Sequence, residues 1–464
     1  MPLQKYLTHY AEPESQKFST FLYRYQHVVV IPCHNEPTSA VHKLLQLPQS
    51  DGPVLCILVI NQPITDIGTD TENGADSTQD ALLWASLKQH YKTLWQAEDQ
   101  SVLYALPDCD HGLLVIDRFS LGRQIPAKQG VGLARKIGAD IASAFIHKGN
   151  IASRWIHSTD ADVKLPSDYF LATQSIEQPL ASAALLYPFE HRCTDLTLQP
   201  FINLYEFKLR YYVAALQHSG SLYAFHTIGS LMCINADSYA SVRGFPKRSA
   251  AEDFYLLNKL AKVGSIQSLK QPIIEVEARL SNRVPFGTGP ALSHIKEMTN
   301  PLDQYCFYNP RSFVDLSMWL SLASPLWQNR QRYQTDGLEH TLRFISAASI
   351  CTTNIDTANI DTTNGPEPDQ TQRLIKVLQE LKLETFLAHG FKQCSSEAAF
   401  QKQLMHWFDG FKTLKFIHLM RSYFYEDIRL QELTDEHDEW LNTIFSTGSQ
   451  NGTALSQTIL NLTF

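Results

Sequence analysis

The sequence has no long hydrophobic run and no paired-cysteine motif, and each absence argues against a class of protein. Its longest unbroken apolar stretch, Val54 to Ile60, has seven residues, whereas a transmembrane helix needs about 20. Its eight cysteines lie at least 23 positions apart and form no CxxC pair, unlike the cysteines of disulfide-stapled domains. We therefore expect no transmembrane segment and no disulfide framework.

Basic residues are fewer than acidic ones. The 464 residues include 39 lysines and arginines against 47 acidic residues, which gives a net charge of −8. Because no basic cluster stands out, this balance argues against nucleic acid as the main partner. The first 25 residues mix charged side chains with aromatics and form no apolar signal-peptide core. We therefore expect a cytoplasmic protein.

The first three quarters of the chain contain apolar, β-branched runs that alternate with helix-like stretches. The runs cover residues 27–31, 54–60, 112–116 and 154–158, and the helix-like stretches cover residues 38–47, 78–96 and 130–147. Such alternation predicts an α/β fold with a mainly parallel sheet flanked by helices. In open sheets of this type, ligands bind beyond the carboxyl ends of the strands.

The carboxyl-terminal part has a different pattern. Residues 351–370, CTTNIDTANIDTTNGPEPDQ, repeat NIDT and contain no basic residue, which predicts a flexible linker. Apolar residues then recur at helical spacing. We therefore predict an amino-terminal extension (1–24), an α/β domain (25–295), a helical extension (296–350), the linker (351–370) and a helical carboxyl-terminal domain (371–464).

Three motifs could carry chemistry, and the first follows the run VVVI. Here Pro32-Cys33-His34-Asn35-Glu36-Pro37 presents polar side chains where prolines end the strand. These side chains could grip a nucleotide. The alternative is an ordinary strand-to-helix turn in which Asn35 or Thr38 caps the helix.

The second motif, Arg154 to Asp162, is a short apolar strand that ends in two carboxylates, Asp160 and Asp162, separated by one small residue. Mg²⁺ and Mn²⁺ prefer oxygen ligands and are commonly held by one or two carboxylates, with substrate phosphates completing the shell. The pair fits such a site. The alternative is a solvated acidic turn.

The third motif begins with the strand-like GSLMCIN of residues 229–235 and leads to Glu252 and Asp253 at the start of an amphipathic helix. A helix start stabilises carboxylates, so capping is one interpretation. The other is a general base that takes a proton from an acceptor hydroxyl.

These blocks, in this order, resemble the family 2 glycosyltransferases, whose catalytic domain has the GT-A fold. The resemblance covers about residues 25–290, and its matching segments are VVVIPCHNE, QGVGLARKIGADIA, STDADVKLPSDYF and GSLMCINADSYASVRGFPKRSAAEDFYLLNKL. It implies a GT-A-like fold and a nucleotide-sugar-dependent hexosyltransferase of glycan or cell-envelope biosynthesis. The acceptor would be a glycan, a lipid-linked molecule or a small molecule.

The resemblance also implies a role for each motif. The nucleotide sugar would contact Pro32, Asn35 and Glu36. A divalent cation, Mn²⁺ or Mg²⁺, would bind Asp160 and Asp162 together with the donor diphosphate. Asp253, with Glu252 beside it, would be the base. A metal-assisted leaving group and one base give a single displacement with inversion at the anomeric carbon.

Further candidates follow from the same comparison. Lys128 and Arg135, near the start of the third helix-like stretch, would face the donor phosphates, and the alternative is a surface helix. His294 would complete the metal shell, although a lone histidine is more often structural. Most family members have an aspartate-rich turn after the second strand, and here Asn61 stands at that place.

Two other classes of function stay open. A sugar nucleotidyltransferase would also use a doubly wound sheet and metal-bound carboxylates, but a glycine-rich, lysine-bearing loop would be expected after its first strand, and PCHNEP is not such a loop. A non-catalytic nucleotide-sugar-binding protein of the same fold would differ only in lacking turnover.

Overall fold

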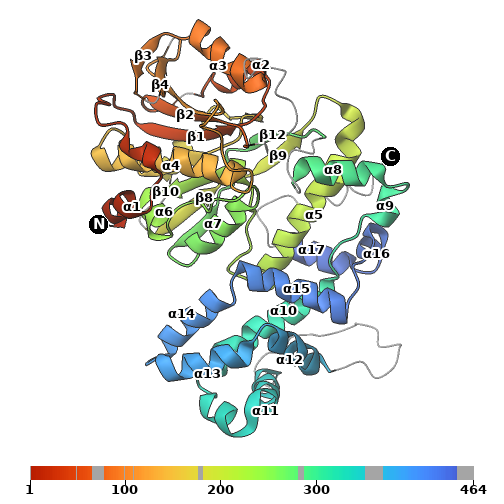
Figure 1. Ribbon diagram of the computed structural model, residues 1–464. Coiled ribbons are helices and arrows are strands. Elements are labelled where there is room, and N and C mark those ends of the chain that lie inside the picture. The colour runs from red at the N-terminus through yellow and green to blue at the C-terminus, as the bar shows by residue number, and fades with distance from the viewer. Residues whose placement is uncertain are drawn as a thin grey trace. The chain divides into compact units, whose positions relative to one another are not determined.

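The computed structural model describes residues 2–48, 50–64, 78–98, 100–107, 109–175, 181–280, 287–350 and 369–446. The chain divides into two compact units (Figure 1). The first unit comprises residues 1–202 and 225–294, and the second comprises residues 203–224 and 295–464. The boundaries fall within α5 (Gln199–His218) and α8 (Thr288–Glu297).

A mixed sheet forms the centre of the first unit. In the described residues its strands are β1 (His27–Cys33), β2 (Val54–Asn61), β3 (Thr93–Gln96), β4 (Val102–Ala105), β5 (Gly112–Arg118), β6 (Trp155–Ser158), β8 (Ser182–Leu186), β10 (Met232–Asn235) and β11 (Ser265–Ser268). Their order is β11-β8-β10-β6-β1-β2-β5-β4-β3. The central strands β6, β1, β2 and β5 run parallel. β1 and β2 are buried along their whole length, which explains their continuous apolar sequences.

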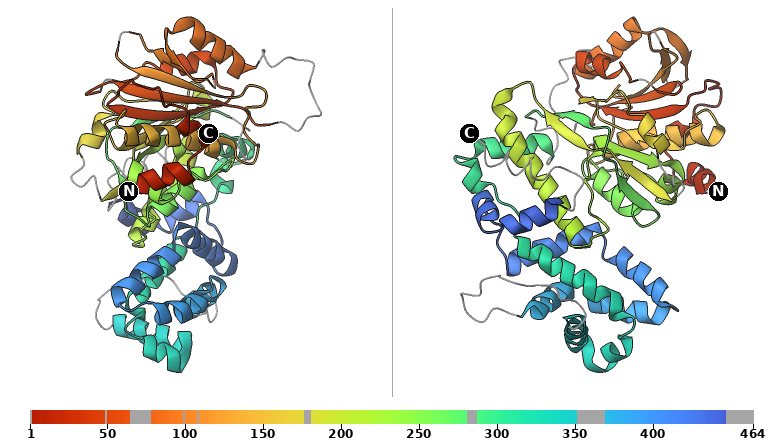
Figure 2. Two further views of the ribbon diagram at one scale, coloured as in Figure 1. Left: turned by 60° about the vertical axis from the view of Figure 1, so that its left-hand side comes forward. Right: turned by 180° about the vertical axis from the view of Figure 1, so that it is seen from behind.

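Helices cover both faces of the central strands. Figure 2 shows α1 (Pro2–His9) and α4 (Gly130–Lys148) on one face, and α2 (Thr38–Leu44) and α3 (Gln79–His90) on the other. α4 packs closely on β1. A Cβ at Gly138 would lie 2.3 Å from Val30 Cγ1, so only glycine fits at this position. The predicted α/β fold with flanking helices is confirmed.

One predicted helix is shorter than expected. The stretch 78–96 forms α3 only as far as His90, and residues 93–96 form the strand β3. The chain becomes extended at Tyr91, with φ −116° and ψ 143°. Thr93, Trp95 and Gln96 then pair with β4, and Thr93 and Trp95 belong to the β-branched and aromatic types that favour strands.

A second, three-stranded sheet lies beside the motif that contains Asp160. It consists of β7 (Val163–Lys164), β12 (Ile274–Glu277) and β9 (Phe189–Arg192), in the order β7-β12-β9. β7 follows Asp162 directly and pairs antiparallel with β12. This pairing brings the segment after β12 to the acidic motif.

Helices make up the second unit in its described part. They are α9 (Pro301–Gln304), α10 (Pro310–Ala323), η6 (Ser324–Leu326), α11 (Arg330–Ile350), α12 (Gln370–Glu380), α13 (Leu383–Gln393), α14 (Glu397–Trp407), α15 (Gly410–Tyr423), α16 (Leu430–Asp435) and α17 (Asp438–Ser446), with parts of α5 and α8. The carboxyl-terminal helical region is therefore confirmed. Residues 351–368 of the predicted linker lie outside the described residues. Within the described residues, no helix combines the length and apolar character needed to cross a membrane.

Candidate functional site

The first and second motifs meet at one edge of the sheet. β1 and β6 are parallel neighbours, with Val30 opposite Ser158, so their carboxyl ends lie side by side. The turn after β6 is fixed at both ends. Thr159 N–H donates to Val30 O at 3.1 Å, and Glu277 N–H donates to Asp162 O at 3.2 Å. These bonds hold the acidic turn between β1 and β12.

Arg135 of α4 joins the second and third motifs. Its side chain is only 3% exposed. Nε donates to Glu252 Oε1 at 2.9 Å, and Nη2 donates to Asp160 Oδ1 at 2.5 Å. Nη1 donates to Ser158 Oγ at 2.9 Å. One guanidinium thus holds together carboxylates that are 92 positions apart in the sequence.

A glycine makes room for this guanidinium. Gly229 begins the short helix η5 (Gly229–Leu231). A Cβ at this position would lie 2.4 Å from Arg135 Nη2 and 2.9 Å from Arg135 Cζ, closer than carbon approaches such atoms. Close packing of Arg135 therefore requires glycine at position 229.

Asp253 is not the N-cap residue of α7 (Glu252–Leu260), but its side chain accepts from one of the free N–H groups of the first turn. The N-cap residue is Ala251, with φ 60° and no side-chain cap. Asp253 Oδ1 accepts a hydrogen bond from the N–H of Phe254 at 2.7 Å. Burial, followed by the charge of Glu252, raises the pKa of Asp253 to about 7, while the Phe254 bond and Arg135 oppose the shift. A carboxyl with such a pKa exchanges protons near neutral pH.

A second arginine, Arg279, connects the first and second motifs. Its Nη2 donates to Glu36 at 2.9 and 2.7 Å and to Asp162 Oδ2 at 3.1 Å. Burial by itself would lower the pKa of Arg279, but the hydrogen bonds to Glu36 and the charges of Glu36 and Asp162 raise it. The sequence alone does not indicate Arg279, because it belongs to none of the three motifs.

The nucleotide candidates lie at the ends of β1 and β2. Pro32 is buried in β1, and Asn35 is exposed, with φ 53°. The Asn35 N–H donates to Asp80 Oδ1 at 2.8 Å, and His34 Nδ1 lies 2.8 Å from Asn61 O. Among the described residues, neither Asn61 Oδ1 nor Asp80 Oδ2 has a hydrogen-bond partner. Asn61 is 5% and Asp80 1% exposed, and Asp80 Oδ2 lies 3.7 Å from His34 Nδ1, so both oxygens are buried acceptors in the described part of the chain.

The other two basic candidates lie in exposed positions. Lys128 is in the turn before α4, and His294 is in α8. In the described part of the chain, no group of three or more His, Cys, Asp or Glu side chains is arranged to hold a metal ion. The structure therefore does not bring His294 into such a group with Asp160 and Asp162.

The charge balance at the site favours a cation. Two arginines contact or neighbour five carboxyl groups, which belong to Glu36, Asp160, Asp162, Glu252 and Asp253. The side chains of Asp160 and Asp162 are 37% and 20% exposed, so both remain accessible. Two accessible carboxylates fit a divalent ion whose shell is completed by phosphate oxygens.

The sequence matches no protein-family model and no curated protein. Solved structures of S. aureus TarS are similar at low level. TarS 1–349 in complex with UDP-GlcNAc has 10% identity and a TM-score of 0.35, covering 82% of this chain and 89% of that chain. A second structure of TarS 1–349 has 9% identity and a TM-score of 0.33, covering 74% of this chain and 98% of that chain. TM-scores this low carry no inference about activity.

Proposed function

We propose that this chain is a divalent-metal-dependent glycosyltransferase that moves a sugar from a nucleotide-diphosphate sugar to an acceptor hydroxyl with inversion. The observation that supports this proposal is the joining of Asp160 and Glu252 by Arg135. Asp253 follows Glu252 directly in the sequence, and burial raises the pKa of Asp253 to about 7. We assign the reaction to residues 25–295.

Asp160 and Asp162 are the proposed ligands of Mn²⁺ or Mg²⁺. The bound cation would neutralise the charge of the leaving diphosphate as a Lewis acid. Arg135 is nearly enclosed and bonded to protein acceptors on all three nitrogens. Its proposed role is therefore to hold Asp160 and Glu252 in place and not to touch the donor phosphates.

Asp253 is the proposed general base. Its carboxylate takes the proton of the acceptor hydroxyl while the acceptor oxygen forms its bond to the anomeric carbon and the nucleoside diphosphate leaves from the opposite face. Positioned bases contribute about 10² to 10⁴ in rate. Glu252 already bonds to Arg135 at 2.9 Å, which favours Asp253 as the group free to take a proton.

The nucleoside is proposed to lie against the ends of β1 and β2. Asn61 Oδ1 and Asp80 Oδ2 are buried acceptors, suited to the N–H groups of a base. Asn35 and Glu36 would flank it, with Glu36 oriented by Arg279.

The test is incubation of the full chain with a panel of UDP-, GDP- and TDP-sugars and Mn²⁺, followed by measurement of nucleoside diphosphate release. Turnover of one donor identifies both base and sugar. Binding of a donor without release, in the presence of candidate acceptors, would instead support a nucleotide-sugar-binding protein. Release of pyrophosphate from a nucleoside triphosphate and a sugar phosphate would support a nucleotidyltransferase.

A further inference from the structure

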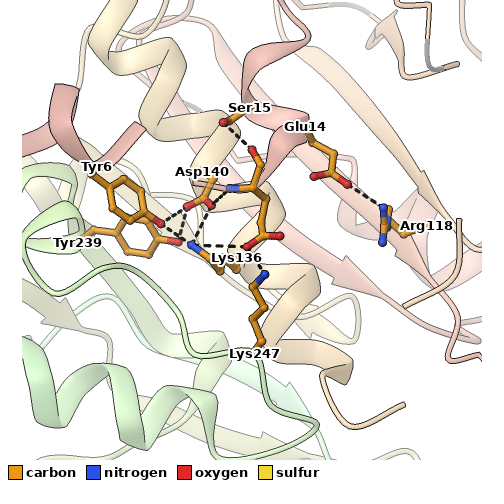
Figure 3. A network of polar contacts seen from close by, with 9 residues as sticks. Tyr6, Glu14, Ser15, Arg118, Lys136, Asp140, Tyr239 and Lys247 are labelled. Atoms are coloured by element: carbon orange, nitrogen blue, oxygen red, sulfur yellow. Dashed lines mark hydrogen bonds and ion pairs between the residues drawn. The ribbon is translucent and has the colours of Figure 1, made fainter. Parts of the chain in front are cut away.

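The amino-terminal residues are tied to α4 by a buried polar network (Figure 3). The Tyr6 hydroxyl of α1 donates to Asp140 Oδ1 at 2.5 Å, and Lys136 Nζ donates to the same hydroxyl oxygen at 2.6 Å. Lys136 also bonds to Asp140 at 3.0 Å, and the Tyr239 hydroxyl donates to Asp140 at 2.9 Å. Tyr6, Lys136 and Asp140 are all under 5% exposed.

A second contact from the same segment reaches the chain that leads to α7. The Glu12 N–H donates to Asp140 Oδ2 at 2.7 Å, and the Glu12 carboxylate lies 2.7 Å from Lys247 Nζ. η1 (Pro13–Gln16) follows Glu12 and packs on α4. Residues 2–17, named here the amino-terminal strap, therefore contact both α4 and residues 246–249.

These two elements are the ones that bring Arg135 and Glu252 together. Gly132 N–H donates to Arg248 O at 2.9 Å, and a Cβ at Gly132 would lie 2.5 Å from Pro246 O. The start of α4 is thus pressed against residues 246–249, three positions before Glu252. Lys136, which the strap holds, is the neighbour of Arg135 in the sequence.

We infer that the amino-terminal strap is a positioning element, which holds α4 and residues 246–249 in register so that Arg135 stays between Asp160 and Glu252. Its catalytic consequence rests on the proposed function, but the holding itself does not. A shift of α4 away from the strap would leave Lys136 or Asp140 as a buried charge without its partner in the strap, which is costly. Catalytic groups that move by about 1 Å can lose about 10² in rate.

The test compares Tyr6→Phe with Tyr10→Phe in the full chain. Tyr6→Phe removes the hydroxyl that bridges Asp140 and Lys136 but keeps the ring. Tyr10 lies at the end of the same helix, is 39% exposed, and contacts Arg243 through its ring, so Tyr10→Phe is the matched control. Amide hydrogen exchange of peptides covering residues 130–137 and 246–253 reports how tightly both segments are held.

We expect Tyr6→Phe to speed exchange in both segments by about threefold or more, and Tyr10→Phe to leave it unchanged. Unchanged exchange in Tyr6→Phe would overturn the inference, whether or not the protein is a glycosyltransferase. This measurement needs no ligand, so a parent protein that turns over none of the donors would contradict the proposed function alone.

Turnover then tests whether the strap acts through Arg135. With UDP-, GDP- and TDP-sugars as donors, kcat should fall about tenfold in Tyr6→Phe. In a protein that already carries Arg135→Lys, adding Tyr6→Phe should lower kcat no further, because the effects of two changes that act through the same residue are not additive. Faster exchange and a lower melting temperature with a parental kcat would overturn the positioning role, leaving the strap purely structural. An equal loss of kcat on adding Tyr6→Phe to the parent and to the Arg135→Lys variant would also overturn the positioning role.

Discussion

Arg135 and Arg279 are the residues that turn separate motifs into one site. Carboxylates at close range repel one another, and each arginine offsets this repulsion by bonding to two of them. The fixed fork of a guanidinium also sets the directions in which its partners lie. Lysine at either position would supply the charge but not the geometry.

The first residue-scale prediction concerns the proposed metal ligands. Asp160→Asn and Asp162→Asn should each weaken the binding of UDP or GDP in the presence of Mn²⁺ by about tenfold or more, because a neutral amide is a poor ligand for a hard cation. The fold should survive, since both side chains are partly exposed and the amide oxygen of asparagine can still accept a hydrogen bond from Arg135 or Arg279. Titration calorimetry with and without Mn²⁺ measures the effect.

Asp237→Asn is the matched control. Asp237 pairs with Arg154 on the surface and is not among the carboxyl groups around Arg135 and Arg279. Its replacement should leave Mn²⁺-dependent binding unchanged. If Asp160→Asn and Asp162→Asn bind the nucleotide like the parent, the metal assignment fails.

The second prediction concerns Asp253 as the base. Asp253→Asn should lower kcat by about 10² or more with little change in donor affinity, because a base acts in the transition state. In the parent, the rate should fall as the pH drops below about 7, where this carboxyl takes up a proton. A steady-state pH profile checks this limb. A parental rate in Asp253→Asn, with a loss in Glu252→Gln, would reverse the two roles.

The same titration predicts a stability effect. The pKa of Asp253 is about 7 in the folded chain against an ordinary value of 3.8. Between about pH 4 and pH 7 the folded state keeps a proton that the unfolded chain has released, so the contribution of this group to stability falls as the pH rises. Asp253→Asn should flatten the pH dependence of unfolding in this window. Urea denaturation at several pH values measures the free energy of unfolding. The same change of this free energy with pH in Asp253→Asn and in the parent would argue against the raised pKa.

At the scale of elements, η5 and α4 depend on one glycine. Gly229→Ala should push the Arg135 guanidinium away, because the new Cβ would overlap Nη2 and Cζ. Overpacking of this kind costs about 1–3 kcal/mol, and nucleoside diphosphate release should fall together with stability. Ser230→Ala is the control, since the buried Ser230 hydroxyl has no hydrogen-bond partner among the described residues. Equal effects of both changes would show that the Arg135 contact is not the cause.

The elements that carry the site could be predicted because their signals are local. Apolar runs located β1, β2, β5 and β6, and helical spacing located α4 and α7. Arg279 could not be predicted, because its partners Glu36 and Asp162 lie in the segments that follow β1 and β6, and the pairing of β7 with β12 brings Arg279 to them. The end of α3 at His90 was missed for a related reason, since pairing with β4 overrides the helical pattern of residues 91–96.

At the scale of the whole molecule, the second unit contains helices from both sides of the predicted linker. Asp315 of α10 is 1% exposed. It accepts hydrogen bonds from Gln370 at 2.7 Å, from Arg373 at 3.2 Å and from the Tyr425 hydroxyl at 2.9 Å. These three partners follow residues 351–368 in the sequence. Composition can mark a linker, but it cannot show that the segments on its two sides pack together.

Cleavage within the predicted linker should not separate the helices on its two sides. A broad protease should cut first within residues 351–370, because this stretch is acidic and consists mainly of small polar residues. A denaturing gel should then show fragments of about 350 and about 95 residues. The nicked protein should nevertheless elute from gel filtration as one species, since Gln370, Arg373 and Tyr425 stay bonded to Asp315. In Asp315→Ala, the same nick should let the fragments separate at lower urea concentration, because Arg373 is left as a buried charge without this partner. Fragments that part in native buffer would contradict the packing, and cleavage at another internal site would contradict the linker.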